Sequence, residues 1–200
     1  MRKAIHHLKQ ADPVLAQIIA KAGPYRIRYH EPCFASLASS IIYQQLSGRV
    51  AGAIQGRVEA AMPEGRMTPE GVLGMEETAL RACGLSGQKT KYLRHLAECT
   101  VKGDVRFEEL PALSDEEVIE RLTLVKGVGE WTAHMFLIFT LRRPDVLPTG
   151  DLGVRSAMRR AYRMRALPKP ERMEKIAAKW RPYRSVASWY LWRSLENEAE

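Results

Sequence analysis

The residues best suited to chemistry lie in two short segments, Leu124–Ala133 and Leu147–Val154. The first contains Lys126-Gly-Val-Gly-Glu130, and two glycines in this spacing permit a tight turn. The amides at the start of a following helix would carry the positive end of its dipole, which suits a phosphate. The second segment carries a lone carboxylate, Asp151, directly after Pro148-Thr-Gly150. Together they indicate a phosphate-binding turn followed by an isolated acid.

Asp151 also has a purely structural interpretation. It precedes Leu152-Gly-Val-Arg-Ser-Ala-Met158, which has the composition of a helix start. Aspartate is among the best N-cap residues, and replacing such a cap typically costs about 1 kcal/mol. From position alone, the cap is the favoured role.

The elements that must position these segments are helical. Apolar residues repeat with helical spacing along the chain, and no alternating run suggests a sheet, so the pattern predicts an all-α protein. Asp12-Pro13 resembles a cap followed by a first-turn proline and predicts a helix through about Ile19. From Pro32 to about Ala61, two apolar helices flank the polar run Gln44–Gly48. This run is either a contact site or a plain surface turn.

Further local signals bound the other helices. Thr68-Pro69 starts a short helix, Met62–Gly65 forms a loop, and the apolar spacing predicts a helix over 89–98. Ser114-Asp-Glu-Glu117 is a capping box that opens a helix reaching about Leu122. The glycine turn is therefore expected between this helix and an apolar helix from about Trp131 to Leu141.

Composition limits the class of protein. Thirty-one Lys and Arg against 23 Asp and Glu give a net charge of +8, which suits a polyanionic partner, although solvated helix faces explain many single arginines equally well. Cys33, Cys83 and Cys99 form no C-x-x-C pair, so neither a disulfide framework nor a four-thiolate cluster is expected. No stretch has the length of a membrane span, and we expect a soluble intracellular protein.

The two segments together closely resemble the signature of the helix-hairpin-helix DNA glycosylase superfamily. Arg181–Trp192 and Ile42–Ser47 resemble the branch of 3-methyladenine DNA glycosylase II, so the resemblance covers about Pro32 to Trp192. It implies two helical lobes, approximately 35–140 and 1–34 plus 141–200, with the active-site cleft between them. An N-terminal β-rich lobe, present in larger relatives, is not expected.

The resemblance also implies how DNA is bound. The hairpin would contact the DNA backbone at Lys126, Gly127, Val128, Gly129 and Glu130. The main-chain carbonyls of Thr123, Val125 and Val128 would hold a structural Na⁺ or K⁺. Backbone contacts of this kind position a protein without reading sequence. The partner is double-stranded DNA containing damaged bases, and a monomer without membrane contact is expected.

Within the resemblance, Asp151 matches the catalytic aspartate. Its anion would stabilise the positive charge that develops on the sugar as the N-glycosidic bond breaks, and would orient or activate the attacking water. Relatives that also cleave the strand carry a lysine two residues after the hairpin's last glycine, where this chain has Trp131. The resemblance therefore implies hydrolysis alone, with no catalytic cofactor and no iron–sulfur cluster.

The remaining candidates concern base flipping. A base must leave the stack before its sugar carbon can be attacked, and something must fill the gap. The resemblance assigns this role to Gln45, with Leu46 and Ser47 beside it, and leaves open whether Gln45 or Leu46 enters the stack. It assigns the base pocket to Trp131, Trp192, Met135 and Leu152. Trp180 and Tyr183 are expected to be plain core.

The resulting hypothesis is a monofunctional DNA glycosylase of base excision repair that releases alkylated purines, chiefly 3-methyladenine and also 7-methylguanine, and leaves an abasic site. Aromatic rings attract the positive charge of such purines by roughly 0.5 to 2 kcal/mol. Two alternatives stay open: a non-catalytic hairpin module that binds damaged DNA, and a glycosylase for deaminated bases.

Overall fold

A computed structural model describes residues 1–196, and these residues form helices and connecting turns without a β-strand. The all-α prediction is therefore confirmed. The α-helices are α1 (Arg2–Ala11), α2 (Pro13–Ala22), α3 (Phe34–Tyr43), α4 (Gly48–Ala60), α5 (Pro69–Gly74), α6 (Glu77–Ala82), α7 (Gly87–Lys102), α8 (Asp115–Thr123), α9 (Glu130–Phe139), α10 (Leu152–Ala161), α11 (Pro170–Ala177) and α12 (Arg184–Glu196). Three short 3-10 helices are η1 (Pro63–Gly65), η2 (Leu110–Ala112) and η3 (Ala178–Trp180). Among the described helices, none is both long enough and apolar enough to cross a membrane.

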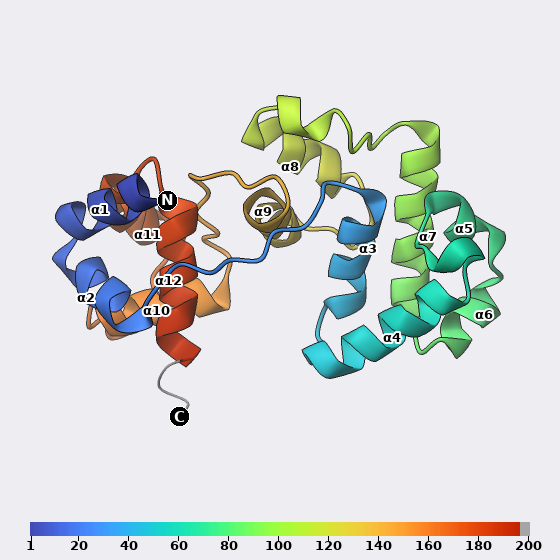
Figure 1. Ribbon diagram of the computed structural model, residues 1–200, viewed down its shortest axis with the longest axis horizontal. Coiled ribbons are helices and arrows are strands. Elements are labelled where there is room, and N and C mark those ends of the chain that lie inside the picture. The colour runs from blue at the N-terminus through green and yellow to red at the C-terminus, as the bar shows by residue number, and fades with distance from the viewer. Residues whose placement is uncertain (197–200) are drawn as a thin grey trace. The chain divides into compact units, whose positions relative to one another are not determined.

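The chain forms two compact units. The terminal unit joins Met1–Tyr29 to the chain from Leu137 onward, and the central unit is the continuous stretch His30–Phe136. Figure 1 shows the helices of each unit by label. The chain leaves the central unit within α9, so the Asp151 segment belongs to the terminal unit and the glycine turn to the central unit.

Helix α12 is the centre of the terminal unit, where α2 and α10 pack against it (Figure 1). Its residues from Val186 to Leu191 are buried, including Trp189 and Tyr190. Leu8 from α1 and Leu15 from α2 complete the same core with no exposed surface. Burying such side chains stabilises a fold by about 1.5–3 kcal/mol each.

Asp12 is fully buried between α1 and α2 and forms polar contacts with residues in the last third of the chain. Its Oδ1 accepts the amides of Val14 and Leu15, which makes it the N-cap of α2. Its Oδ2 accepts the Trp180 Nε1–H at 2.8 Å and the Tyr162 hydroxyl, and lies 3.2 Å from Lys179 Nζ. Trp180 was expected to be plain core, but its indole N–H is also part of this polar cluster.

Replacing Asp12 with Ala is expected to destabilise the protein by about 3 kcal/mol at neutral pH, because the buried Trp180 indole, the half-buried Tyr162 hydroxyl and the α2 cap lose their acceptor. Urea unfolding of the variant and of Asp104→Ala, which removes an exposed aspartate, would measure the difference. An Asp12→Ala variant as stable as Asp104→Ala would contradict the role of this cluster.

The contribution of Asp12 also depends on pH. Burial alone would raise the pKa of Asp12, but hydrogen bonds from Tyr162, Trp180 and the Leu15 amide together bring it below the ordinary value of 3.8. A carboxylate with a lowered pKa binds fewer protons in the folded state than in the unfolded one. The stability advantage of wild type over Asp12→Ala is therefore full above the ordinary value and shrinks as the pH falls below it.

The central unit is built on α7, which packs against both α3 and α5 (Figure 1). Leu93 and Leu96 of α7 and Leu37 and Ile41 of α3 are fully buried. Their spacing of three and four residues places each pair on one helix face. Helices α3 and α7 therefore pack together through these buried side chains.

Local capping signals predicted several helix starts correctly. Ser114 and Glu117 form the predicted capping box, and the Thr68 hydroxyl accepts the Gly71 amide. Four expectations are wrong in element type or bounds. The helix expected over 89–98 is longer, since α7 runs from Gly87 to Lys102. Met62–Gly65 is not a simple loop, because Pro63–Gly65 makes a 3-10 turn. Helix α2 continues to Ala22, and α9 stops at Phe139 rather than Leu141, where the Arg143 amide turns back to the Leu137 carbonyl.

Candidate active site

Asp151 is fixed at the first turn of α10 in the terminal unit. Its Oδ1 accepts the Val154 amide at 2.7 Å and the Trp192 Nε1–H at 2.8 Å. Both groups can only donate, so Oδ1 is the acceptor in both bonds, as suits a carboxylate. The residue is 8% exposed. The predicted cap is confirmed, and a second donor from α12 orients the same carboxyl group.

The Trp192 ring lies close to two residues distant from it in the chain, Phe139 and Gly153. Its ring stacks on Phe139, the last residue of α9, with centroids 5.7 Å apart and planes 26° apart. A Cβ added to Gly153 would lie 2.9 Å from Trp192 Cδ1 and 3.1 Å from Asp151 Oδ1. Real Cβ atoms essentially never come within 3.0 Å of such neighbours. The absence of a side chain at Gly153 therefore allows Trp192 to reach Asp151.

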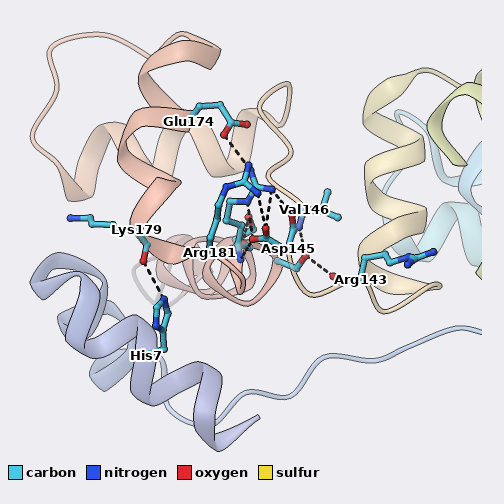
Figure 2. Close-up of polar contacts among 10 residues, drawn as sticks. His7, Arg143, Asp145, Val146, Glu174, Lys179 and Arg181 are labelled. Atoms are coloured by element: carbon cyan, nitrogen blue, oxygen red, sulfur yellow. Dashed lines mark hydrogen bonds and ion pairs between the residues drawn. The ribbon is translucent and has the colours of Figure 1, made fainter. Parts of the chain in front are cut away.

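A polar network joins the chain before Asp151 to the start of α12 (Figure 2). The buried Arg184 guanidinium donates to Asp145 Oδ1 at 2.8 Å and to Glu174 Oε2 at 3.2 Å, and Arg181 also pairs with Asp145. Ser185 adds two bonds, from its hydroxyl to the Arg143 carbonyl and from the Val146 amide to its Oγ. Because Asp145 precedes Asp151 and Arg184 begins the helix that carries Trp192, the network connects the two segments that supply the Asp151–Trp192 bond.

The glycine hairpin follows α8 in the central unit. Two consecutive turns form the hairpin. The Val125 amide donates to the Leu122 carbonyl, and the Val128 amide donates to the Val125 carbonyl. Gly127 has φ +85°, a conformation that favours glycine, and a Cβ there would lie 2.1 Å from the Tyr92 ring. The Lys126 side chain and Gly129 are exposed, whereas Val128 is buried.

The predicted wedge residues lie in a tight turn between α3 and α4. The Leu46 amide donates to the Tyr43 carbonyl at 3.2 Å, which closes the turn. Gln44 has φ −51° and ψ 128°, and Gln45 has φ +58°, so the backbone has the form of a type II turn with Gln45 where glycine is usual. Gln45, Leu46 and Ser47 are exposed. The polar run is a surface turn, which was one of its two interpretations. Its side chains are exposed, so they are also accessible for contact with a partner.

The other predicted pocket residues are distributed over both units. Trp131 and Met135 are one turn apart on α9 in the central unit, with Trp131 46% exposed. Leu152 is the first residue of α10 and is 64% exposed. Among the predicted pocket residues, Trp192 is the one for which the structure gives a hydrogen bond to Asp151.

Sequence reasoning missed several residues of these sites. Phe139 and Gly153 lack a local signal for their roles, because each acts through a residue distant in the chain. Leu124, on the hairpin, is 55% exposed; the sequence places this apolar residue beside the glycine turn, but only the structure reveals its exposure. Among the described residues, no group of three or more His, Cys, Asp or Glu is placed to hold a metal.

Sequence comparison and structure comparison both find similarity to DNA repair proteins. Residues 38–182 match the model of the HhH-GPD superfamily base excision DNA repair proteins. The chain is 36% identical to DNA-3-methyladenine glycosylase 1 of Schizosaccharomyces pombe, over 97% of this chain and 87% of that protein.

Two solved structures are also similar along nearly the whole chain. A 3-methyladenine DNA glycosylase of S. pombe in complex with abasic DNA has a TM-score of 0.85 and 37% identity, covering 96% of this chain and 95% of that one. A DNA-3-methyladenine glycosidase of Bacillus halodurans has a TM-score of 0.85 and 36% identity, covering 98% and 91%. The fold, the family model and these relatives agree, and the chain belongs to the HhH-GPD superfamily of base excision DNA repair proteins.

Proposed function

We propose that this protein is a monofunctional DNA glycosylase that hydrolyses the N-glycosidic bond of alkylated purines, chiefly 3-methyladenine, and leaves an abasic site. The observation that carries the proposal is the carboxyl group of Asp151, held by the Val154 amide and the Trp192 indole in a chain of this superfamily. The names of relatives at 36% identity support the choice of base. We propose that it acts inside the cell, as a monomer, on double-stranded DNA that contains damaged bases.

In the proposed reaction, Asp151 acts at the sugar. As the bond between C1′ and the base nitrogen breaks, its electron pair leaves with the base and neutralises the positive charge of the alkylated purine. The sugar becomes oxocarbenium-like, and the Asp151 anion stabilises it. The oxygen of a water then bonds to C1′, and Asp151 accepts the proton that this water loses. An already cationic base is a good leaving group, so a strong general acid is unnecessary.

Trp131 supports hydrolysis without strand cleavage. It stands where relatives with lyase activity carry their lysine nucleophile, and an indole cannot form a Schiff base with the sugar. Trp131 and Met135 on α9, with Trp192 and Leu152, remain our predicted base-pocket residues.

The hairpin is proposed to bind the DNA backbone. Val128 donates its amide to Val125 within the turn, so the amides of Gly129 and Glu130 are the better candidates for phosphate contact, with the exposed Lys126 ammonium beside them. A carbonyl oxygen has two lone pairs, so Val125 can accept this amide and still face a cation. Thr123, Val125 and Val128 would thus hold Na⁺ or K⁺, which would add positive charge near a phosphate.

Gly153→Ala is expected to slow base release about ten-fold, because the added methyl group must displace Trp192 from Asp151. Single-turnover release from methylated DNA would measure it. Gly56→Ala, in the helix α4 and with open space around the new Cβ, is the matched control. If the cause is displacement of the indole, Gly153→Ala will add little further loss to Trp192→Phe; two independent full losses would point to another cause.

A base-release assay tests the proposed function itself. Methylated duplex DNA and duplexes containing hypoxanthine or uracil would be incubated with the protein, and free bases separated and measured. Release of 3-methyladenine is expected to exceed release of the deaminated bases. Release of hypoxanthine or uracil alone would assign another lesion, and binding without any release would indicate a non-catalytic DNA-binding module.

A further inference from the structure

One face of α7 contacts both the 43–46 turn and the glycine hairpin. Lys89, Tyr92 and His95 are three residues apart along α7, a spacing that places them on a common side of the helix. All of the contacts they make lie within the central unit, where α7 runs beside α3 (Figure 1). Neither segment is close to α7 in sequence, so these contacts are tertiary.

Lys89 holds the end of α3. Its ammonium donates to the Ile42 carbonyl at 2.8 Å and to the Gln44 carbonyl at 2.6 Å. The carbonyls at a helix C-terminus lack partners within the helix, and a lysine there satisfies them. Burial lowers the pKa of Lys89, since the half-buried ammonium is partly withdrawn from water. The Lys89 ammonium therefore binds the carbonyls of the turn and is only partly exposed to solvent.

Tyr92 and His95 hold the hairpin on the same helix. The Tyr92 ring lies against Gly127, so closely that no Cβ fits between them. His95 Nδ1 accepts the Lys126 amide at 3.1 Å. Two successive residues of the hairpin are thus in contact with α7.

Gln44 connects the two segments directly. Its Nε2 donates to the Gly127 carbonyl at 2.9 Å, across 83 positions of the chain. The side chain of Gln44 therefore reaches the hairpin while its own carbonyl accepts Lys89. The three segments form a closed set of contacts: turn to α7, α7 to hairpin, and hairpin to turn.

These contacts act on a strained backbone. Gln45 has φ +58°, which costs a non-glycine residue of the order of 1–3 kcal/mol and persists when the surroundings fix it. Lys89 and Gln44 fix the residues immediately before Gln45. Without them, the turn would relax and the exposed Leu46 side chain would move relative to the hairpin.

We propose that Lys89 and Gln44 are positioning residues for base flipping, which set the Gln45–Leu46 wedge at a fixed place relative to the phosphate-binding hairpin. This rests on the proposed function, since the wedge and the hairpin have meaning only for a protein that flips bases. Flipping costs a few kcal/mol, and a wedge offsets that cost only if it enters the stack at the site the hairpin has anchored. Neither positioning residue needs to touch the damaged base.

The test compares Lys89→Met with Lys91→Met, an exposed lysine on the same helix. Flipping would be followed by fluorescence of 2-aminopurine placed beside an alkylated purine, and chemistry by single-turnover base release. Lys89→Met is expected to lower the fluorescence response and to slow release about ten-fold from a paired lesion, with affinity for undamaged duplex within about two-fold of wild type. Lys91→Met should match wild type, and Lys89→Arg should recover much of the loss.

A mismatched substrate separates positioning from general damage to the fold. Flipping is cheaper for a base that is not paired, so placing the same lesion in a mismatch should restore most of the rate of Lys89→Met. Gln44→Met should behave in the same way and add less than its full effect to Lys89→Met, since both act on one turn. Equal losses on paired and mismatched lesions, together with a lower melting temperature, would overturn the proposal, as would a wild-type fluorescence response.

The two proposals fail in different ways. If wild type releases no base from any substrate, the proposed function is wrong, while a fluorescence response that Lys89→Met reduces still supports the positioning role. If wild type releases bases and Lys89→Met flips and releases them equally well, only the positioning role is wrong.

Discussion

Asp151→Asn is expected to reduce base release by about a thousand-fold while leaving duplex binding nearly unchanged. Asparagine is as good an N-cap as aspartate, so the start of α10 should keep its structure. Its carbonyl oxygen can still accept the Val154 amide and the Trp192 indole that now bond to Oδ1. What it lacks is the negative charge that stabilises the oxocarbenium-like sugar. Single-turnover release and fluorescence anisotropy with labelled duplex would measure the two quantities separately.

Asp104→Asn provides the control, because it makes the same change at an exposed position in the central unit. Thermal melting would show whether either variant alters the fold. A well-folded Asp151→Asn protein that releases bases at nearly the wild-type rate would refute the role of this carboxylate. Loss of DNA binding together with activity would instead indicate that the residue supports the fold around it.

Gly127→Ala should weaken duplex binding about ten-fold or more and destabilise the central unit by about 2 kcal/mol. Two effects add at this position. The φ of +85° is unfavourable for alanine, and the new Cβ would lie 2.1 Å from the Tyr92 ring, so the hairpin must move off α7. Anisotropy with undamaged duplex and urea unfolding would record both losses.

Gly65→Ala separates these two effects. Gly65 has φ +63° in the same unit, but a Cβ there meets nothing within 4 Å. It should lose stability through backbone strain alone and bind DNA as wild type does. Gly127→Ala combined with Tyr92→Ala should recover part of the binding, because the steric clash is then removed. Wild-type binding by Gly127→Ala itself would show that the hairpin does not depend on this close contact.

Sequence could predict the features that depend on neighbours in the chain. The Ser114 capping box, the Thr68 cap and the Asp151 cap each join a side chain to an amide a few residues away. The resemblance added the role of Asp151 and the place of the hairpin. Local signals did not predict the helices α1, α6, α11 and α12, because their patterns are short or lack a strong cap signal.

The contacts that complete the sites join residues far apart in sequence. Lys89 meets the carbonyl of Ile42, and Trp192 meets Asp151 across 41 positions. A lysine on a helix and a tryptophan near the end of the chain are ordinary residues until the fold brings them together. For the same reason, Trp180 could be predicted as core but not as a donor to Asp12.

Asp12 also has a consequence for how the chain folds during synthesis. Its partners Tyr162 and Trp180 lie 150 and 168 positions further on, and the core around Leu8 and Leu15 is completed by α10 and α12. At synthesis rates of about 5–20 residues per second, about ten to thirty seconds pass between the synthesis of α2 and the synthesis of the residues that complete this core. The central unit is continuous in sequence and can fold during this interval. Helices α1 and α2 are therefore synthesised before the central unit but reach their native partners after it.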